Sequence, residues 1–315
     1  MTASADTVIF DLGRVLLEWD PRLAFAEVLP AEEIGEFMEQ ISFAEWNLAH
    51  DAGQEWSVGE TELISRFPDR AEAILAYRRH FARTLTGLVP GTAALVAELQ
   101  RRGVRLIALT NWSAELFPVA RRSFSILDRF EGIVVSGEEQ LAKPDPAIFT
   151  LLCERYGVDP AAAVFIDDSP KNCRAAAAVG LTVINFVDAE STRSALVDLG
   201  LLQTRQPVAG PVFHVAEREL WQQGLDSGDY PWSSRGLSYQ RQGFVHCALP
   251  DQVAGVLAST YADLNRADLV VGEFDPQELD GVVIMEDLGG EGEFPHLYAP
   301  LDLRRSRAVH PGTSF

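Results

Sequence analysis

The residues best suited to chemistry are a few polar side chains that stand far apart in the chain. Asp11 and Asp168 offer carboxylates, and Thr110 offers a hydroxyl. Lys143 offers a compact positive charge, and it is one of only two lysines among 26 basic residues. A carboxylate that attacks a phosphate ester needs a cation to offset the repulsion between anions, and donors for the phosphoryl oxygens. Because clustered carboxylates suit Mg²⁺, the set predicts Mg²⁺-dependent phosphoryl transfer if the fold gathers it.

Alternating strands and helices are expected to position these residues. Three apolar runs that end abruptly in polar residues predict strands: 8–10 before Asp11, 104–109 before Thr110 and Asn111, and 164–166 before Asp167 and Asp168. Helical patterns bounded by Pro or Gly cover three further segments: 92–102, 146–156 and 170–179. This alternation predicts an α/β fold with a doubly wound parallel sheet. Ligands bind beyond the carboxyl ends of such strands, so the polar residues are expected to face one crevice.

Residues of about 20–86 interrupt the alternation and look helical throughout. A helical insert at this place is expected to form a cap over the crevice. The insert contains aromatic residues, which we expect to serve packing rather than ligand binding: Phe25, Phe37, Phe43, Trp46, Trp56, Phe67 and Tyr77.

Four segments of the chain, FDLGRVLLEWD, ALTNWSAE, LAKPDPAIF and VFIDDSPKNCRAAAAVG, resemble the four motifs of the haloacid dehalogenase (HAD) superfamily. The resemblance covers residues of about 5–200 and is to the subgroup with a small helical cap, subfamily IA. That subgroup includes bacterial α-D-glucose-1-phosphate phosphatases and the N-terminal phosphatase domain of soluble epoxide hydrolase. The implied fold is a HAD-like Rossmannoid sheet with a helical cap.

The resemblance also implies site residues. Asp11 would form an aspartyl-phosphate, and Thr110 and Asn111 would hold the phosphoryl group together with Lys143. The implied Mg²⁺ ligands are Asp11, Asp168 and the backbone carbonyl of Gly13, and the implied surrounding residues are Asp167 and Asn172. Lys171 is either a helper beside Asn172 or a solvated helix residue.

Gly13 departs from a common pattern, because many HAD phosphatases have a second aspartate there that acts as general acid and base. Its loss costs about 10²–10⁴ in rate. Three explanations stay open: a good leaving group such as an anomeric sugar oxygen, a proton donor in the cap such as His50 or Asp51, or feeble catalysis. The resembling glucose-1-phosphate phosphatases also have glycine there, so inactivity does not follow. We therefore expect a hydrolase, a phosphoric monoester hydrolase of a small phosphorylated metabolite such as a sugar phosphate.

Two alternatives remain at this point. A 2-haloacid dehalogenase-type hydrolase also uses a nucleophilic aspartate, but it needs no metal and would leave Asp167 and Asp168 without a role. A regulatory protein that binds a ligand on a silent HAD scaffold is the other alternative, and Gly13 keeps it open.

The composition of the sequence and the pattern of expected elements change after about residue 200. Residues 201–210 read as a linker between a HAD-like domain at 1–200 and an α+β domain at 211–315. Four short strands are expected in the second domain: 212–215, 243–246, 268–271 and 281–285. The segments HVAERELWQQGL, GFVHCALPDQV and GGEGEFPHLYAPL resemble domain-of-unknown-function family 952, which is grouped with ADP-ribosyltransferase-like folds. Its candidate site residues, for a nucleotide ligand or for structural hydrogen bonds, are His214, His246, Glu286, Glu293, His296 and Tyr298.

The composition of the chain excludes some classes of binding partner. The net charge of −20 offers no basic footprint, so nucleic-acid binding is not expected. No apolar run is long enough to span a membrane, and the first ten residues lack the charge of a secretory signal, so a cytoplasmic protein is expected. Three distant cysteines predict buried free thiols rather than disulfides.

Overall fold

The computed structural model describes residues 5–205, 207–288 and 292–315. The chain divides into two compact units, residues 1–89 with 103–202 and residues 90–102 with 203–315. The domain boundaries expected from the sequence stay a prediction. All three cysteines are free and buried. Within the described parts of the chain, none of the helices combines the length and apolar character needed to cross a membrane.

A five-stranded parallel sheet forms the centre of the first unit, in the order β5-β4-β1-β6-β7. Its strands are β1 (Thr7–Phe10), β4 (Arg105–Thr110), β5 (Gly132–Val135), β6 (Ala163–Asp167) and β7 (Thr182–Asn185). The three strands predicted from apolar runs are confirmed as β1, β4 and β6. Each of the three is buried along nearly its whole length, as expected for a sheet covered on both faces.

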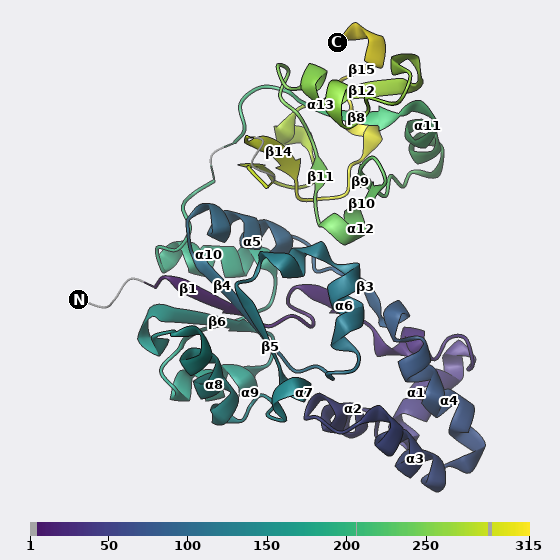
Figure 1. Ribbon diagram of the computed structural model, residues 1–315, viewed down its shortest axis with the longest axis vertical. Coiled ribbons are helices and arrows are strands. Elements are labelled where there is room, and N and C mark those ends of the chain that lie inside the picture. Colours follow the sequence, from purple (N-terminus) through teal and green to yellow (C-terminus); the bar gives the residue numbers. More distant parts are fainter. Residues whose placement is uncertain (1–4, 206, 289–291) are drawn as a thin grey trace. The chain divides into compact units, whose positions relative to one another are not determined.

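Helices follow the strands and cover the sheet. They are α6 (Phe117–Ser123), α7 (Ser136–Glu139), α8 (Pro146–Tyr156), α9 (Pro170–Ala178) and α10 (Ala189–Asp198), with short 3₁₀ turns at Ser125–Arg129 and Pro160–Ala162. Helices α8 and α9 lie on one face of the sheet and α10 on the other (Figure 1). Helix α8 begins where Asp145 accepts the N–H of Ala147 and ends at Gly157, whose φ of 60° few other residues adopt at low cost.

The insert after β1 forms the predicted cap. It contains α1 (Ala31–Gln40), α2 (Phe43–Asp51), α3 (Trp56–Arg66) and α4 (Ala71–Arg79), with 3₁₀ turns at Pro21–Ala24, Pro68–Arg70 and Phe81–Thr84. The expectation that residues 20–86 are helical throughout is wrong at the end of this range. Strand β3 (Leu85–Leu88), in which buried and exposed residues alternate, pairs antiparallel with β2 (Leu17–Trp19) at the base of the cap.

Aromatic rings hold the cap together. The ring of Phe25 lies 5.3 Å from that of Phe37 and 5.8 Å from that of Tyr77, and the ring of Trp46 lies 5.0 Å from that of Trp56. Phe25, Phe37, Trp56 and Tyr77 are almost fully buried. Such pairs add about 0.5–1.5 kcal/mol each beyond area burial, so the expected packing role of the aromatics is confirmed for these rings.

The second unit is mostly antiparallel. Its strands form three small sheets, with the orders β15-β12-β8, β11-β14-β13 and β10-β9. They are β8 (Val212–Glu217), β9 (Trp232–Ser234), β10 (Leu237–Ser238), β11 (Val245–His246), β12 (Leu269–Phe274), β13 (Val283–Glu286), β14 (Phe294–Leu297) and β15 (Ala308–Pro311). The four predicted strands correspond to β8, β11, β12 and β13.

The helices of the second unit are α5 (Thr92–Arg101), α11 (Arg218–Ser227), α12 (Tyr239–Gln242) and α13 (Val253–Ser259). Short 3₁₀ turns lie at Arg266–Asp268, Pro276–Glu278, Leu303–Arg305 and Gly312–Ser314.

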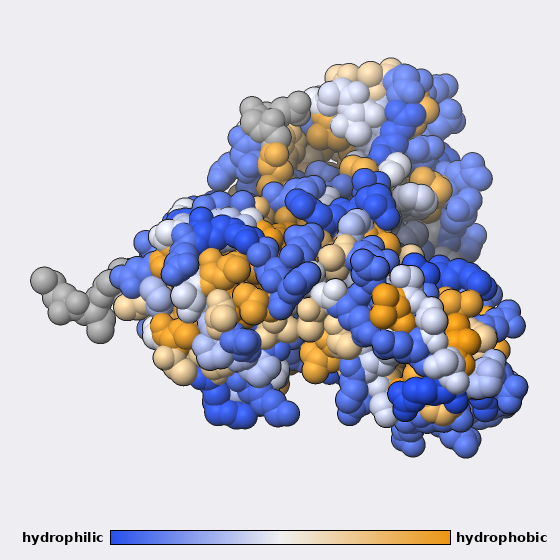
Figure 2. Space-filling model, turned by 60° about the horizontal axis from the view of Figure 1, so that its bottom comes forward, coloured by the Kyte–Doolittle hydropathy of each residue, from blue (hydrophilic) through white to orange (hydrophobic). Residues whose placement is uncertain are grey.

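The face of the molecule seen in Figure 2 is mostly hydrophilic, with apolar side chains in separate groups, as the strongly acidic composition leads one to expect.

Candidate active site

Three aspartates meet at the carboxyl ends of two neighbouring strands. Asp11 directly follows β1, Asp167 ends β6, and Asp168 comes next. The parallel register pairs Phe10 with Ile166, so the residues that follow them lie side by side. One carboxylate oxygen from each of the three aspartates lies within 4.8 Å of the others. The rule that parallel strands end at one edge of a sheet therefore located this cluster correctly.

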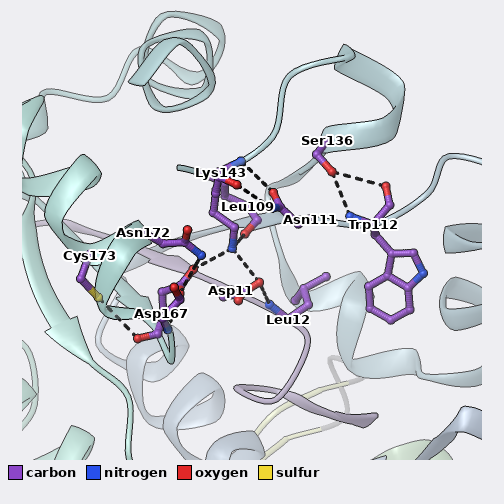
Figure 3. A network of polar contacts seen from close by, with 11 residues as sticks. Asp11, Leu12, Leu109, Asn111, Trp112, Ser136, Lys143, Asp167, Asn172 and Cys173 are labelled. Atoms are coloured by element: carbon purple, nitrogen blue, oxygen red, sulfur yellow. Dashed lines mark hydrogen bonds and ion pairs between the residues drawn. The ribbon is translucent and has the colours of Figure 1, made fainter. Parts of the chain in front are cut away.

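Lys143 lies among these carboxylates (Figure 3). Its Nζ lies 2.8 Å from Oδ1 of Asp11 and 2.7 Å from Oδ2 of Asp167, and it donates to the carbonyl of Leu109 at 2.9 Å. The residue is only 2% exposed, so its charge depends on these partners. Burial works to lower the pKa of Lys143, but the charges of Asp11 and Asp167 outweigh it and hold the pKa above its usual value. The ammonium group therefore stays charged.

The carboxylate of Asp167 has hydrogen-bond or ion-pair partners on both of its oxygens. The backbone N–H of Ser169 donates to its Oδ1 at 2.8 Å, and the amide of Asn172 donates to both oxygens at 3.0 and 3.1 Å. Together with Lys143 these contacts use most of the acceptor sites of a carboxylate. Asp167 and Asn172 thus lie where they can position Lys143 rather than contact a ligand themselves.

The charges of the cluster fit a divalent cation. Three carboxylates and one ammonium group leave a formal charge of −2. Asp168 is half-buried, and burial, followed by the charge of Asp167, raises its pKa. Because Asp167 is already engaged, Asp11 and Asp168 are the carboxylates with free acceptor sites. Carboxylate and carbonyl oxygens are the ligands that Mg²⁺ prefers, so the donor set fits this ion.

Thr110 ends the neighbouring strand β4 and Asn111 follows it, but their side chains differ in what they contact. The Thr110 hydroxyl is buried and has no hydrogen-bond partner within the described residues. Such an orphan is costly unless a ligand satisfies it. Asn111 instead donates to the carbonyl of Lys143 and accepts its N–H, both at 2.8 Å (Figure 3). Its amide therefore fixes the lysine, and contact with a phosphoryl group stays a prediction for Asn111.

A pocket of about 80 Å³ lies between the cap and the loop after β4, and the residues near the cluster in sequence that line it are Gly13 and Asn111. Gly13 lies on its floor, and a Cβ added at Gly13 would meet nothing within 4 Å. Most of the wall is apolar and comes from both cap and sheet: Trp19, Trp56, Tyr77, Phe81, Trp112 and Leu116. Trp56 and Tyr77, expected to serve packing alone, thus also line the pocket.

Of the two cap residues expected as candidate proton donors, only Asp51 lines the pocket. Asp51 is the last residue of α2. Burial raises the pKa of Asp51 to about 7; the N–H of Ser113 opposes the shift and the charge of Asp11 adds to it. His50 is stacked on Trp56 with ring centroids 3.8 Å apart, and its Nδ1 donates to the carbonyl of Gln54 at 2.9 Å. His50 is therefore part of the cap core.

The candidates in the second unit fall into separate places. Nδ1 of His296 lies 2.9 Å from Oε1 of Glu286, and the Tyr298 hydroxyl donates to the same oxygen. The ring of His246 lies 4.9 Å from that of His296. His246, Glu286 and His296 together line a pocket of about 630 Å³. His214 and Glu293 do not join this cluster.

The two excluded candidates have partners elsewhere. His214 donates from Nδ1 to the carbonyl of His246 at 2.8 Å and accepts from the hydroxyl of Tyr230 at 2.9 Å, so both its ring nitrogens are used. Glu293 is exposed, and its carboxylate lies 3.3 Å from Arg101.

The sequence analysis named some residues that line the pocket but missed others. Ser113 and Trp112 follow the Thr110-Asn111 motif directly, so their distance from the strand end could have identified them. Trp19 and Phe81 carry no comparable signal, because their exposure to the pocket depends on how the cap packs.

Comparison with known proteins adds the family. Residues 5–180 match the family model of haloacid dehalogenase-like hydrolases, and residues 215–309 match the model of DUF952, a protein family of unknown function. A HAD-family enzyme from Bacteroides thetaiotaomicron has the same fold, with a TM-score of 0.50 at 23% identity over 61% of this chain and 98% of that one.

Two curated relatives are phosphatases. A phosphoserine phosphatase from Thermus thermophilus is 31% identical over 158 residues, or 50% of this chain, which spans only 57% of that protein's length. A sesquiterpene phosphatase from Aspergillus oryzae is 26% identical over 201 residues, or 61% of this chain and 95% of that protein. Since the family match covers more than half of the sequence and includes Asp11, Thr110, Lys143 and Asp168, this chain belongs to the haloacid dehalogenase-like hydrolases.

Proposed function

We propose that the chain is a Mg²⁺-dependent phosphatase that hydrolyses a phosphate monoester through an aspartyl-phosphate on Asp11. The observation that carries the proposal is the position of Lys143, whose ammonium group lies between Asp11 and Asp167. A nucleophilic carboxylate can approach a phosphate dianion only if their charges are offset, and a buried cation does this without reorganisation. The phosphatase relatives support the same activity.

The chain's own residues divide the work of the reaction. Lys143 and the N–H of Leu12, which lies 2.7 Å from Oδ1 of Asp11, hold the nucleophile in one orientation. The unpaired hydroxyl of Thr110 is available to donate to a phosphoryl oxygen. Asp11, Asp168 and the Gly13 carbonyl would hold Mg²⁺, which when bound offsets the charge of the phosphoryl group. Aromatic side chains of the cap that line the pocket, Trp56 and Tyr77, place apolar surface beside the site.

The pocket favours an ester of a neutral alcohol. Within the described lining, no side chain is Lys, Arg or His, so a second anionic group on the substrate would have no cationic partner. The aromatic wall suits an apolar group or the apolar face of a sugar ring. The sugar phosphate expected from the sequence belongs to this neutral class and stays a proposal.

A substrate panel tests the proposal. The panel compares phosphate esters of neutral alcohols, such as glucose 1-phosphate, with esters that carry a carboxylate, such as phosphoserine, with and without Mg²⁺. We expect turnover that requires Mg²⁺, is lost in Asp11→Asn and is faster for the neutral esters. Absence of turnover across the panel, or turnover that persists in Asp11→Asn, would contradict the proposal.

The two alternatives from the sequence, a dehalogenase and a silent scaffold, predict different results with the same purified protein. A dehalogenase would release halide from 2-haloacids without Mg²⁺. A silent scaffold would bind beryllium fluoride at Asp11 as a phosphoryl mimic and turn over no ester.

A nucleotide ligand for the second unit is a separate proposal. It is supported by the pocket of about 630 Å³ that His246, Glu286 and His296 line. Calorimetry of the full chain with NAD and ADP-ribose tests it, with His246→Ala as the matched variant. No heat at millimolar ligand would count against the proposal.

A further inference from the structure

The cluster around Asp11 lacks a group that can protonate a leaving alkoxide. An alkoxide is a poor leaving group, and general-acid catalysis accelerates its departure by about 10²–10⁴. Gly13 has no side chain, and the space beside it is open to the pocket. Lys143 is committed to Asp11 and Asp167. A proton donor must therefore come from the cap side of the pocket.

Asp51 is the carboxyl that the cap presents there. It ends α2 and lines the pocket together with Gly13 and Asn111. Its carboxyl lies close enough to Asp11 and Lys143 for both charges to act on it. Of the described residues that line this pocket, none other than Asp51 is a carboxylic acid.

Contacts to both the cap and the sheet hold Asp51 in place. The amide of Asn47, one turn earlier in α2, donates to its Oδ2 at 2.9 Å. The backbone N–H of Ser113, beyond the end of β4, donates to the same carboxyl group. The backbone carbonyl of Asp51 accepts from the hydroxyl of Ser136 at 2.5 Å. That hydroxyl in turn accepts the N–H of Trp112 at 2.9 Å. Such anchoring is what a proton donor needs, because a loosely held acid loses its orientation.

The environment of the carboxyl suits proton transfer in both directions. Burial raises the pKa of Asp51 to about 7, and the nearby charge of Asp11 adds to this while Lys143 opposes it. The Tyr77 ring from α4 lies on the same side, where the charge of Asp51 acts on its hydroxyl. An acid is most effective when its pKa lies near the working pH, so both protonation states are accessible at neutral pH.

We propose that Asp51 is the general acid and base of the phosphatase reaction, replacing from the cap the side chain that Gly13 lacks. The inference rests on the proposed function. In the first step a carboxylate oxygen of Asp11 bonds to phosphorus while the bond from phosphorus to the alcohol oxygen breaks. The electron pair stays on the alcohol oxygen, which takes the proton of Asp51. In the second step water attacks the phosphorus, Asp51 takes one of its protons, and the bond to Asp11 breaks to release phosphate.

The decisive experiment compares leaving groups in Asp51→Asn. Asparagine keeps the shape of the side chain but cannot transfer a proton as an acid. For alkyl phosphates, whose alkoxide needs a proton, we expect kcat to fall by about 10²–10⁴, whereas for p-nitrophenyl phosphate the first step should change by less than about tenfold. Single-turnover release of the alcohol isolates this first step. Glu45→Gln, at an exposed position of the same helix, is the matched control and should leave both substrates unaffected.

A second variant keeps the test independent of folding. Since a Cβ added at Gly13 would meet nothing within 4 Å and Gly13 has no positive φ, the backbone at this position accepts the substitution Gly13→Asp. Added to Asp51→Asn, it should restore a large part of the lost alkyl phosphatase activity. A single-turnover release of p-nitrophenol at a rate near that of the wild type shows that Asp51→Asn is folded.

The outcomes separate the two proposals. If the wild type turns over and Asp51→Asn slows the first step equally for both leaving groups, or not at all, the role of Asp51 is overturned and the phosphatase stands. Absence of Mg²⁺-dependent turnover in the wild type would overturn both.

Discussion

The ammonium group of Lys143 lies 2.8 Å from Oδ1 of Asp11 and is almost fully withdrawn from solvent. The same group is bound to Asp167 and to the carbonyl of Leu109, so it is a fixed part of the sheet edge rather than a mobile surface charge. Preorganised charge of this kind costs no reorganisation when a phosphate dianion arrives. Lys143 therefore links the stability of the site to its chemistry.

Substitution of Lys143 should damage both properties. Lys143→Met leaves Asp11 and Asp167 buried without their cation, which is expected to cost about 3–5 kcal/mol of stability in the absence of Mg²⁺. Phosphatase activity should fall by at least about 10²-fold, the usual cost of removing one preorganised group. Denaturant unfolding and kcat measure the two effects. Lys171→Met is the matched control, since Lys171 is exposed, and a similar loss there would contradict the assignment.

Thr110 should show the opposite balance between stability and activity. Its buried hydroxyl has no partner within the described residues, and an unmet hydroxyl costs about 1–3 kcal/mol. Thr110→Val has nearly the same shape and should raise the free energy of unfolding by about 1 kcal/mol, while kcat falls by about 10²-fold because a phosphoryl donor is lost. Thr110→Ser keeps the hydroxyl and should retain activity. A destabilised Thr110→Val variant would indicate a structural role instead.

The predictability of the site depended on which residues sit at strand ends. Asp11, Thr110 and Asp168 follow buried apolar runs, and parallel strands must bring such ends together, so these positions could be read from local patterns. Strands β2 and β3 were not predicted, because three or four residues with alternating exposure carry little signal.

Residues that reach the site through tertiary packing were harder to read. Whether His50 or Asp51 faces the pocket depends on the rotation of α2, which is fixed by contacts such as the stacking of His50 on Trp56. The amide of Asn111 could not be assigned to Lys143 from sequence, because the two residues are 32 positions apart. In the second unit, strand β14 contains Pro295, a residue that argues against a strand in local rules.

Mg²⁺ should stabilise the wild type through the aspartate cluster. The formal charge of −2 favours a divalent cation, and a ligand at 100 times its Kd adds about 2.7 kcal/mol to the free energy of unfolding. A thermal titration with MgCl₂ should therefore raise Tm, and Asp168→Asn should abolish the rise without abolishing the fold. Glu138→Gln, at an exposed acidic residue of the same unit, is the matched control. An equal Mg²⁺ response in Asp168→Asn would place the ion elsewhere.

Acid should weaken the second unit through His214. Burial lowers the pKa of His214 to about 4 from its usual 6.5, although the hydrogen bond to the carbonyl of His246 opposes the shift. Between these values the unfolded chain binds more protons than the native one, so this contribution to stability is complete above pH 6.5 and is lost as the pH falls toward 4. The loss amounts to about 3 kcal/mol.

Hydrogen exchange of the β8 and β12 amides, followed by mass spectrometry between pH 7 and 4, measures this loss after correction for intrinsic exchange rates. His214→Gln should flatten the pH dependence by removing the titrating ring. Tyr230→Phe is the matched control, because it removes the hydroxyl that donates to Nε2 and leaves the imidazole in place, so the slope should persist. An unchanged slope in His214→Gln would assign the acid sensitivity to another group.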